Sequence, residues 1–540
     1  MRANVWTLQT IFKPIRLVLR TRYIYWVPSA TIAIAVLLIP LYLIIRTLGS
    51  GDEVWEILIR TRTLGVLFRT LALIGTVVAF SILLAVPLAW ITVRTDLPMR
   101  RLISVLAVLP LVIPSYVGGF LIVVALGPKG MLQNFLQDLF AIESLPNIYG
   151  FPGAALALTL LSYPYILLTV RASLRRIDPA LEEGSRGLGY GSWSTFLNIT
   201  LNQLGPAIGA GSLLVALYTL SDFGAVSILQ YETFTWAIFI QYQTAFNRSI
   251  AAALSLILVL VAVLILTVEA VTRRSSQLYQ SSARGMRTPN LIPLNKWKWP
   301  AFGYSCFIVS LALFLPIFVL GFWVVRGISA GESLELVWTH VFNSISISAL
   351  AAGLTVIAAL PVSFLAVRHS GWLTRFIERS TYLGFALPGI VVALAIIYFG
   401  VNYVPFLYQT FALLLVAYVI LFLPTASGAV KASLLQVNSK VEDAARSLGS
   451  KPINVFLTIT LPLLKPGIIT GGALVFLVTL KELPATLLLS PIGFQTLSTS
   501  IWSATTEAFF AKAAASSLLL ILVASIPMAW ILLRDREGIR

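Results

Sequence analysis

Long apolar stretches recur along this chain and constrain its fold more than any other feature. A helix needs about 20 apolar residues to cross roughly 30 Å of hydrocarbon, and the sequence holds twelve stretches of that kind. Hydrophobic residues make up 58% of the 540 residues and charged residues only 11%, so polar side chains are too few to coat the surface in water. The sequence therefore predicts an all-α integral membrane protein that is surrounded by membrane lipid.

The predicted spans form two groups of six. They lie near residues 25–46, 70–93, 102–126, 151–170, 206–229 and 249–271, and near 300–325, 343–367, 378–400, 408–430, 464–490 and 512–533. The first span follows a basic segment but is too long for the core of a signal peptide, so we expect a retained anchor. A polar, serine-rich stretch separates the two groups. We therefore expect a first half at residues 1–271, a cytoplasmic linker at 272–299 and a second half at 300–540.

Basic residues predict the orientation of these spans. The net charge is +17, and arginine and lysine gather at both termini and in alternate loops, which the positive-inside rule places in the cytoplasm. Both termini are then cytoplasmic, which requires an even number of spans and agrees with twelve. Because no basic stretch is interleaved with aromatic residues on a polar background, we expect no nucleic acid as a partner.

The two halves are repeats of one another in the same topological sense. At an offset of 274 residues, Arg94 meets Arg368, and at an offset of 260 residues the segment 181–211 meets 441–471 without gaps. Extra residues near 127–150 absorb the difference between the offsets. Parallel repeats predict a pseudo-two-fold axis along the membrane normal, with a path for cargo between the halves.

Each half carries a cytoplasmic loop that we expect to be helical, at residues 178–202 and 438–462. Asp178 precedes Pro179, which is a favourable helix start, and Asn438 occupies the matching position in the second loop. Acidic side chains follow in the first turns, where the helix dipole favours them: Glu182, Glu183, Glu442 and Asp443.

A glycine is placed to end each of these helices. Gly189 and Gly449 can adopt a left-handed conformation and let another backbone approach, and a second short helix is then expected to begin. About 30 structured residues, present twice, exceed what a connection needs, so we interpret both loops as docking surfaces. The alternative is a pair of interfacial surface helices, held by Leu188, Phe196, Leu448 and Phe456.

The loops resemble the EAA motif of binding-protein-dependent ABC importer permeases: EAA, three residues, Gly, nine residues, then I-x-L-P. The matching residues are Glu183, Gly184, Ser185, Gly189, Ile199, Leu201 and Asn202 in the first loop, and Asp443, Ala444, Ala445, Gly449, Ile459, Leu461 and Pro462 in the second. Departures from the motif are Gly184, Ser185, Asn202 and Asp443. The resemblance implies a type I ABC importer permease (MetI-like) fold in the bacterial inner membrane, with 12 transmembrane helices as two parallel six-helix repeats.

By the same resemblance, each loop supplies a coupling helix that sits in a groove of an ATPase subunit. The coupling residues would be Glu182, Glu183, Gly189, Glu442, Asp443 and Gly449. Two ATPase copies and a periplasmic binding protein are the implied partners, and this chain would be no enzyme, because ATP is hydrolysed by the partner. No GxxxxGK[ST] phosphate loop occurs in the sequence, and no tightly bound cofactor is expected.

Charged residues inside spans are candidates for the translocation path. Asp222 and Glu482 are repeat-related, and Lys481 precedes the second of them. Gly224 and Pro484 should break the helices beside these carboxylates. Lining of the path and anchoring at the outer interface both remain open as roles for these charges.

The string KELPATLLL, followed by GFQTLSTSIW, resembles the ferric-iron branch of this family. Fe3+ is a hard cation that prefers oxygen ligands, so Asp222 and Glu482 are candidate transient metal ligands. Thiamine, polyamine and phosphonate importers share the architecture and remain alternatives. A proton-coupled secondary transporter is a more remote one, because the loop RTDLPMRR does not match the GxxxDR pattern of that class. Sites of histidine and cysteine are not expected, since the only such residues are Cys306, His340 and His369.

Overall fold

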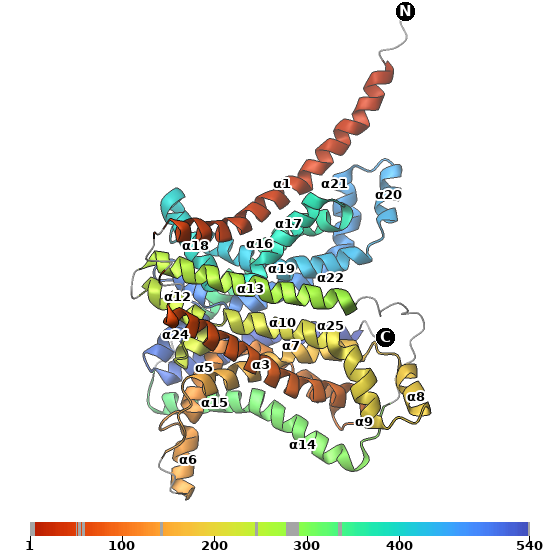
Figure 1. Ribbon diagram of the computed structural model, residues 1–540. Helices are drawn as coiled ribbons and strands as arrows, with labels where there is room; N and C mark the ends of the chain where they lie inside the picture. Colours follow the sequence, from red (N-terminus) through yellow and green to blue (C-terminus); the bar gives the residue numbers. More distant parts are fainter. Residues whose placement is uncertain are drawn as a thin grey trace, which may run out of the picture. The chain divides into compact units, whose positions relative to one another are not determined.

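The computed structural model describes residues 6–49, 51, 56, 60–140, 144–243, 247–276, 291–332 and 337–537. In these ranges the chain consists of helices joined by short loops, 3-10 turns and π turns, and its β pairing is confined to one isolated bridge (Figure 1). The predicted all-helical membrane fold is confirmed.

Every predicted span position holds an apolar helix. Eleven helical segments in the described ranges are long and apolar enough to cross a membrane. The third of them, Ser115–Asp138, combines α5 with most of α6 (Met131–Phe140), and the shorter apolar helix α18 occupies the ninth position. The first half contributes α1 (Trp6–Leu48), α3 (Thr61–Arg94), α5 (Ser115–Leu126), α7 (Phe151–Leu174), α10 (Leu201–Ser221) and α13 (Arg248–Ser276). The second contributes α14 (Lys298–Val309) with α15 (Leu315–Ser329), α16 (Val337–Arg368), α18 (Gly389–Tyr403), α19 (Phe411–Gln436), α22 (Leu461–Leu480) and α25 (Phe510–Glu537).

The third span of each half is broken in its middle. In the first half α4 (Arg100–Leu106) and a 3-10 turn (Leu109–Val112) precede α5, and in the second half α17 (Trp372–Tyr382) and a 3-10 turn (Leu383–Ala386) precede α18. Pro114 and Pro388 stand at the breaks with ψ of 155° and 146°. Proline lacks an N–H and disfavours helix in the preceding residue, so the helix restarts only after it.

The fifth span of each half ends earlier than predicted, at Ser221 and at Leu480. Short helices follow the two ends: α11 (Gly224–Ile228) and α12 (Phe234–Gln243) in the first half, α23 (Pro484–Leu489) and α24 (Leu497–Thr506) in the second. The predicted continuation to residues 229 and 490 is therefore wrong. After each end a carboxylate accepts hydrogen bonds from the first N–H groups of the next short helix, so the chain starts a new helix there and does not continue the span.

The helices group into two compact units that cut across the sequence repeats. The first-half unit comprises Arg46–His340 and Leu497–Ile526, and the second-half unit comprises Met1–Ile45, Val341–Thr496 and Pro527–Arg540. The first span of each repeat thus belongs to the unit built mainly from the other repeat. Most of the predicted linker, residues 277–290, lies outside the described residues.

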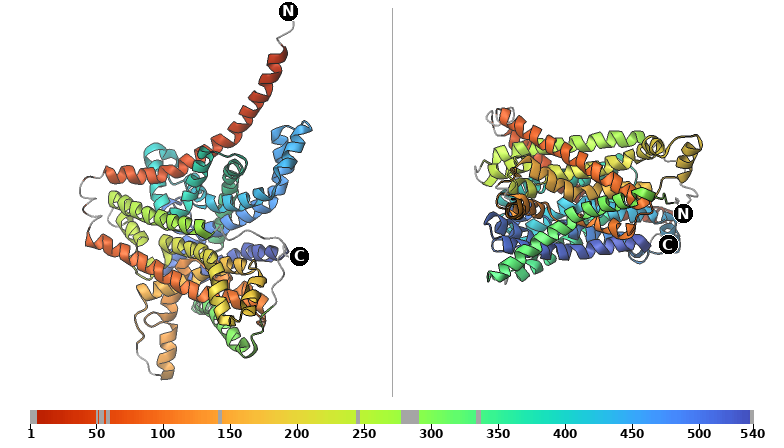
Figure 2. Two further views of the ribbon diagram at one scale, coloured as in Figure 1. Left: turned by 45° about the vertical axis from the view of Figure 1, so that its right-hand side comes forward. Right: turned by 90° about the horizontal axis from the view of Figure 1, so that it is seen from below.

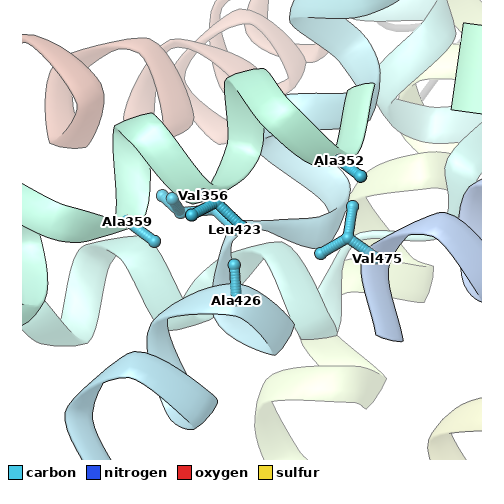
Figure 3. Packing of buried hydrophobic residues seen from close by; sticks show 6 residues of the cluster. All are labelled: Ala352, Val356, Ala359, Leu423, Ala426 and Val475. Atoms are coloured by element: carbon cyan, nitrogen blue, oxygen red, sulfur yellow. The ribbon is translucent and has the colours of Figure 1, made fainter. Parts of the chain in front are cut away.

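Small residues allow close helix packing in both units, as is typical of membrane proteins. In the second-half unit a buried cluster joins α16, α19 and α22 (Figure 3): Ala352, Val356, Ala359, Leu423, Ala426 and Val475. A side chain at Gly471 of α22 would press on Ala426 and Ala429 of α19. Its repeat counterpart Gly211 of α10 lies closer still to Ile166 of α7, so both repeats pack span five on span four through a glycine.

The extra residues of the first half form a helix of their own. α6 (Met131–Phe140) follows α5 and projects away from the spans of the first-half unit, as the orange helix at the bottom of the left view shows (Figure 2). The predicted insertion near residues 127–150 therefore contains a short helix of its own.

Candidate coupling loops and embedded charges

The two predicted docking loops begin with capped helices. α8 (Pro179–Gly187) and α20 (Ser439–Ser447) lie beyond the ends of the spans they follow (Figure 1). The Asp178 carboxylate accepts a hydrogen bond of 3.0 Å from the N–H of Ala180, and the Asn438 side chain accepts one of 3.0 Å from Lys440. Both predicted N-caps are confirmed, so local sequence alone starts each helix at the expected residue.

Both helices end in a left-handed glycine, as predicted. Gly189 has a φ of 90° and Gly449 a φ of 88°. In the first loop the N–H of Gly189 donates to Arg186 and the N–H of Tyr190 to Ser185, at 3.0 and 3.2 Å, which is a Schellman motif. A Cβ at either glycine would meet no atom within 4 Å. Glycine is therefore required here by the backbone conformation and not by a close neighbour.

A buried ion pair ties the first loop to the spans. Arg94, the last residue of α3, lies 2.8 Å from Glu182 of α8, with side chains 2% and 12% exposed. The Thr200 hydroxyl, next to the start of α10, donates to the same carboxylate at 2.8 Å. Glu182 therefore joins three elements that are remote in sequence: the end of span two, the loop helix and the start of span five.

The second loop repeats this arrangement with its own residues. Arg368, at the end of α16, lies 3.0 Å from Glu442, with side chains 16% and 3% exposed. The Thr460 hydroxyl donates to the Glu442 carboxylate at 3.1 Å. Sequence analysis aligned the two arginines and the two glutamates separately but did not pair them, because each pair spans more than 70 residues of chain.

The acidic residues next in sequence remain exposed. Glu183 and Asp443 are exposed. Within the described ranges, Asp443 forms a surface contact of 3.6 Å with Arg446, which contributes little to stability. Two leucines of these loops, Leu188 and Leu448, are 81% and 87% exposed. Each loop thus presents one acid and one large apolar side chain that the rest of the described chain leaves uncovered.

The predicted second short helix of each loop is not a separate element. α9 (Ser192–Thr195) runs through a π turn (Phe196–Thr200) straight into α10, and α21 (Pro452–Val455) runs through a π turn (Phe456–Thr460) into α22. Phe196 packs on Trp90, and Phe456 packs on Phe364, with ring centroids 5.8 and 6.1 Å apart. The phenylalanines therefore pack the start of span five against span two.

A further contact of the first-half unit was missed by sequence analysis. The end of the linker pairs with the loop after α3: Ile292 donates to the carbonyl of Arg94 at 2.8 Å, and Asp96 accepts from the N–H of Leu294 at 2.9 Å. Lys298 adds an ion pair to Asp96 at 3.1 Å. The Leu294 N–H and then Lys298 hold the pKa of Asp96 below its usual range. The acidic residue in RTDLPMRR is the only sequence signal of this contact.

The embedded carboxylates cap the short helices that follow span five. Asp222 accepts hydrogen bonds from the N–H groups of Ala225 and Val226 at 3.0 and 3.2 Å, and Glu482 accepts one from Ala485 at 3.2 Å. Asp222 is buried, whereas Glu482 is half-buried. The predicted helix breaks beside both carboxylates are confirmed.

Each carboxylate also meets the restart of span three. The Ser115 hydroxyl, at the first residue of α5, hydrogen-bonds the Asp222 carboxylate, and a Cβ at Gly389, the first residue of α18, would collide with Glu482 Oε1. Ser115 and Gly389 are repeat-related at the offset of 274. Because the positive end of a helix dipole stabilises an anion, two interrupted spans hold one carboxylate in each unit. Lys481 is half-buried at the end of α22, directly before Glu482.

The chain matches the family model "Binding-protein-dependent transport system inner membrane component" twice, over residues 77–277 and 359–535. It is 38% identical to the Fe(3+)-transport system permease protein FbpB 2 of Haemophilus influenzae, over 90% of this chain and 94% of that protein. It is 25% identical to the ferric transport system permease protein FbpB of Actinobacillus pleuropneumoniae, over 82% of this chain and 67% of that protein.

A shorter relative matches one region of the chain. The molybdenum transport system permease protein ModB of Escherichia coli is 34% identical over 35% of this chain and 85% of its own length. The family match covers most of the chain, and it falls on both repeats, including both loops and both embedded carboxylates. The chain therefore belongs to the family of inner-membrane permease components of binding-protein-dependent transport systems.

Proposed function

We propose that this chain is the permease of an ABC importer that carries ferric iron from the periplasm to the cytoplasm, with ATP hydrolysed by separate subunits. The observation that carries the proposal is the pair of repeat-related loops. A buried ion pair attaches each loop to the spans, and each loop exposes an acidic side chain and a leucine to solvent. The iron cargo is supported by the printed function of the relative that is 38% identical over 90% of this chain.

The loops would transmit force from the ATPase to the spans. In this proposal Glu183 and Asp443 contact the ATPase, while Glu182 and Glu442 fix the loop helices to spans two and five. A displacement of α8 would then be transmitted to α3 and α10, because the Glu182 carboxylate contacts both Arg94 and Thr200. Since the chain carries two such loops, one copy would take two ATPase subunits, with both loops and both termini in the cytoplasm and a binding protein on the outer side.

The interrupted spans would line the route of the cargo. Unwound backbone and charged side chains at membrane depth are tolerated where they face protein or a polar passage, and Asp222, Glu482 and Lys481 meet that description. Carboxylates suit a hard cation such as Fe3+, which would be cargo and not a resident cofactor. Thiamine and polyamines are cationic and remain candidates, whereas phosphonate is anionic and fits less well beside Asp222. Family membership displaces the proton-coupled alternative.

Uptake of radiolabelled ferric iron tests this proposal. A strain that lacks this chain and other ferric importers would carry wild type, a Glu183→Ala/Asp443→Ala variant, or a control with two exposed acids changed outside the loops, Asp138→Ala/Glu507→Ala. We expect uptake with wild type and control, and loss with the loop variant at equal membrane abundance. Absence of ferric uptake with wild type would overturn the cargo, and full uptake with the loop variant would overturn the docking role.

A further inference from the structure

The first-half unit holds a group of phenol side chains around Asp222. Tyr218 lies one turn before Asp222 on α10, and Tyr165 of α7 places its ring centroid 5.7 Å from that of Tyr218. Tyr116, the second residue of α5, is 2% exposed and packs so closely on Gly224 that a Cβ there would lie 2.7 Å from Tyr116 Cβ. Three spans and the re-entrant turn therefore bring phenol side chains near the buried Asp222 carboxylate.

Hydroxyl groups complete an oxygen-rich environment. Ser115 hydrogen-bonds both the Asp222 carboxylate and the Tyr218 phenol. Thr219 is 3% exposed, and among the described residues its hydroxyl has no hydrogen-bond partner. Its repeat counterpart Thr479 is in the same state, so the hydroxyl that distinguishes the first half is that of Ser115 and not that of Thr219.

The second repeat has lost these phenols while keeping a carboxylate. At the same offsets, Tyr116, Tyr165 and Tyr218 correspond to Ile390, Thr425 and Val478. Glu482 replaces Asp222, and it follows Lys481 where the first repeat has Ser221. The duplicated halves therefore differ in chemistry at one matched place. The first has the phenols of Tyr165 and Tyr218 near its acid, whereas the second has Lys481 next to its acid, and its nearby phenol Tyr418 is bonded to Thr486.

We propose that Asp222, Tyr165 and Tyr218, here called the tyrosine site, bind a hard trivalent metal cation in transit, and that Glu482 with Lys481 does not. This inference rests on the proposed function and assigns the cargo to one half of the path. Tyr165 and Tyr218 keep part of their surface exposed, whereas Tyr116 is buried and serves as a wall.

Charge balance supports this choice of ligands. In a medium of low dielectric a bare trivalent ion is costly unless anionic ligands compensate it. One ionised Asp222 and two phenolates carry three negative charges, and the two phenols would each release a proton as the metal binds. The described residues contain no group of three or more His, Cys, Asp and Glu that could hold a metal, so carboxylates alone do not provide such a site there.

Spectroscopy on the purified full-length protein in lipid nanodiscs tests the site without transport. Ferric nitrilotriacetate would be titrated while the visible tyrosinate-to-iron charge-transfer absorption is recorded. We expect the band in wild type, and affinity weakened by at least about tenfold in Tyr165→Phe and in Tyr218→Phe. The matched control is Tyr418→Phe, because the Tyr418 phenol also lies inside the helices but is bonded to Thr486 in the second-half unit. It should leave the band unchanged, as should Glu482→Gln.

Uptake of radiolabelled ferric iron in cells separates the two levels of the proposal. If wild type imports iron and the Tyr165→Phe/Tyr218→Phe variant does so at the same rate without altered absorption, the tyrosine site is wrong while the iron function stands. If wild type imports no iron, the proposed function itself fails. Loss of the band in Glu482→Gln but not in the phenylalanine variants would move the site to the second half. If the Tyr165→Phe/Tyr218→Phe variant loses uptake of thiamine or spermidine but not of iron, the cargo of the site is an organic cation and not a metal.

Discussion

Arg94 and Glu182 form an ion pair of 2.8 Å at the junction of span two, loop helix and span five, and both side chains are nearly withdrawn from solvent. Arg368 and Glu442 reproduce it in the other repeat. Both repeats keep both partners of this buried pair, although their loops differ at the EAA positions. A fixed attachment of the loop helix to spans two and five is what the proposed transmission of force from an ATPase subunit requires.

Removal of one carboxylate from this pair should destabilise the protein. Glu182→Ala leaves Arg94 buried without its counter-charge, a change that costs about 3–5 kcal/mol in comparable buried pairs. Thermal unfolding in detergent should show a clearly lowered midpoint. The matched control is Glu183→Ala, one residue along the same helix but exposed, and it should leave the midpoint unchanged. Equal midpoints for the two variants would contradict a structural role of Glu182.

Bulky residues at the left-handed glycines should uncouple the transporter. Gly189→Leu and Gly449→Leu force a side chain into a conformation that costs about 1–2 kcal/mol per residue, although space for the side chain is free. The strained turn would reorient the exposed face of each loop helix. We expect the double variant to insert normally while ATP hydrolysis by the assembled complex no longer drives uptake, measured in proteoliposomes. Gly191→Leu, exposed in the same loop without a positive φ, is the control.

Normal uptake per ATP in the double glycine variant would remove the coupling role from these turns. Loss of coupling in the Gly191→Leu control as well would show that any larger side chain in the loop interferes. The left-handed conformation would then have no specific role in coupling.

The linker contact at Asp96 should not depend on pH near neutrality. Hydrogen bonding from Leu294 and the charge of Lys298 lower the pKa of Asp96 from the ordinary value of 3.8. A lowered pKa means that the contact is fully present above the ordinary value and is lost only as the pH falls through the lowered one. Hydrogen exchange of residues 291–297 should therefore show constant protection, after correction for intrinsic rates, at pH 6 and pH 8, and Asp96→Ala should reduce protection at both. Protection that changes in this window would indicate a different titrating group.

Local rules account for what the sequence predicted correctly. Hydropathy located all twelve span positions, and capping chemistry at Asp178 and Asn438 placed the starts of both loop helices within one residue. The left-handed turns at Gly189 and Gly449 also follow from local preference. Each of these features depends on residues within one or two turns of helix, so a single sequence is enough to infer it.

Features that depend on packing between remote segments were not predicted. Glu182 looked like a helix-dipole acid of the docking loop, and only the fold brings it to Arg94, 88 residues away. Ser115 and Tyr165 carried no signal in an apolar sequence, yet both lie in the oxygen-rich group around Asp222. The breaks beside Asp222 and Glu482 were predicted from Gly224 and Pro484, but the predicted spans still continued past them, because the residues beyond Asp222 are as apolar as those before it.

Neutralising both embedded carboxylates should reduce transport without preventing assembly. Asp222→Asn and Glu482→Gln keep an oxygen that can accept the capping N–H bonds of α11 and α23, so the breaks in span five should persist. The negative charge is lost, and with it the attraction for a cationic cargo. We expect ATPase subunits to copurify in normal amounts while iron uptake falls. The single variants distinguish the two halves: if the tyrosine site binds the cargo, Asp222→Asn alone reduces uptake and Glu482→Gln alone does not. Unchanged uptake in the double variant would show that both carboxylates act only as helix caps.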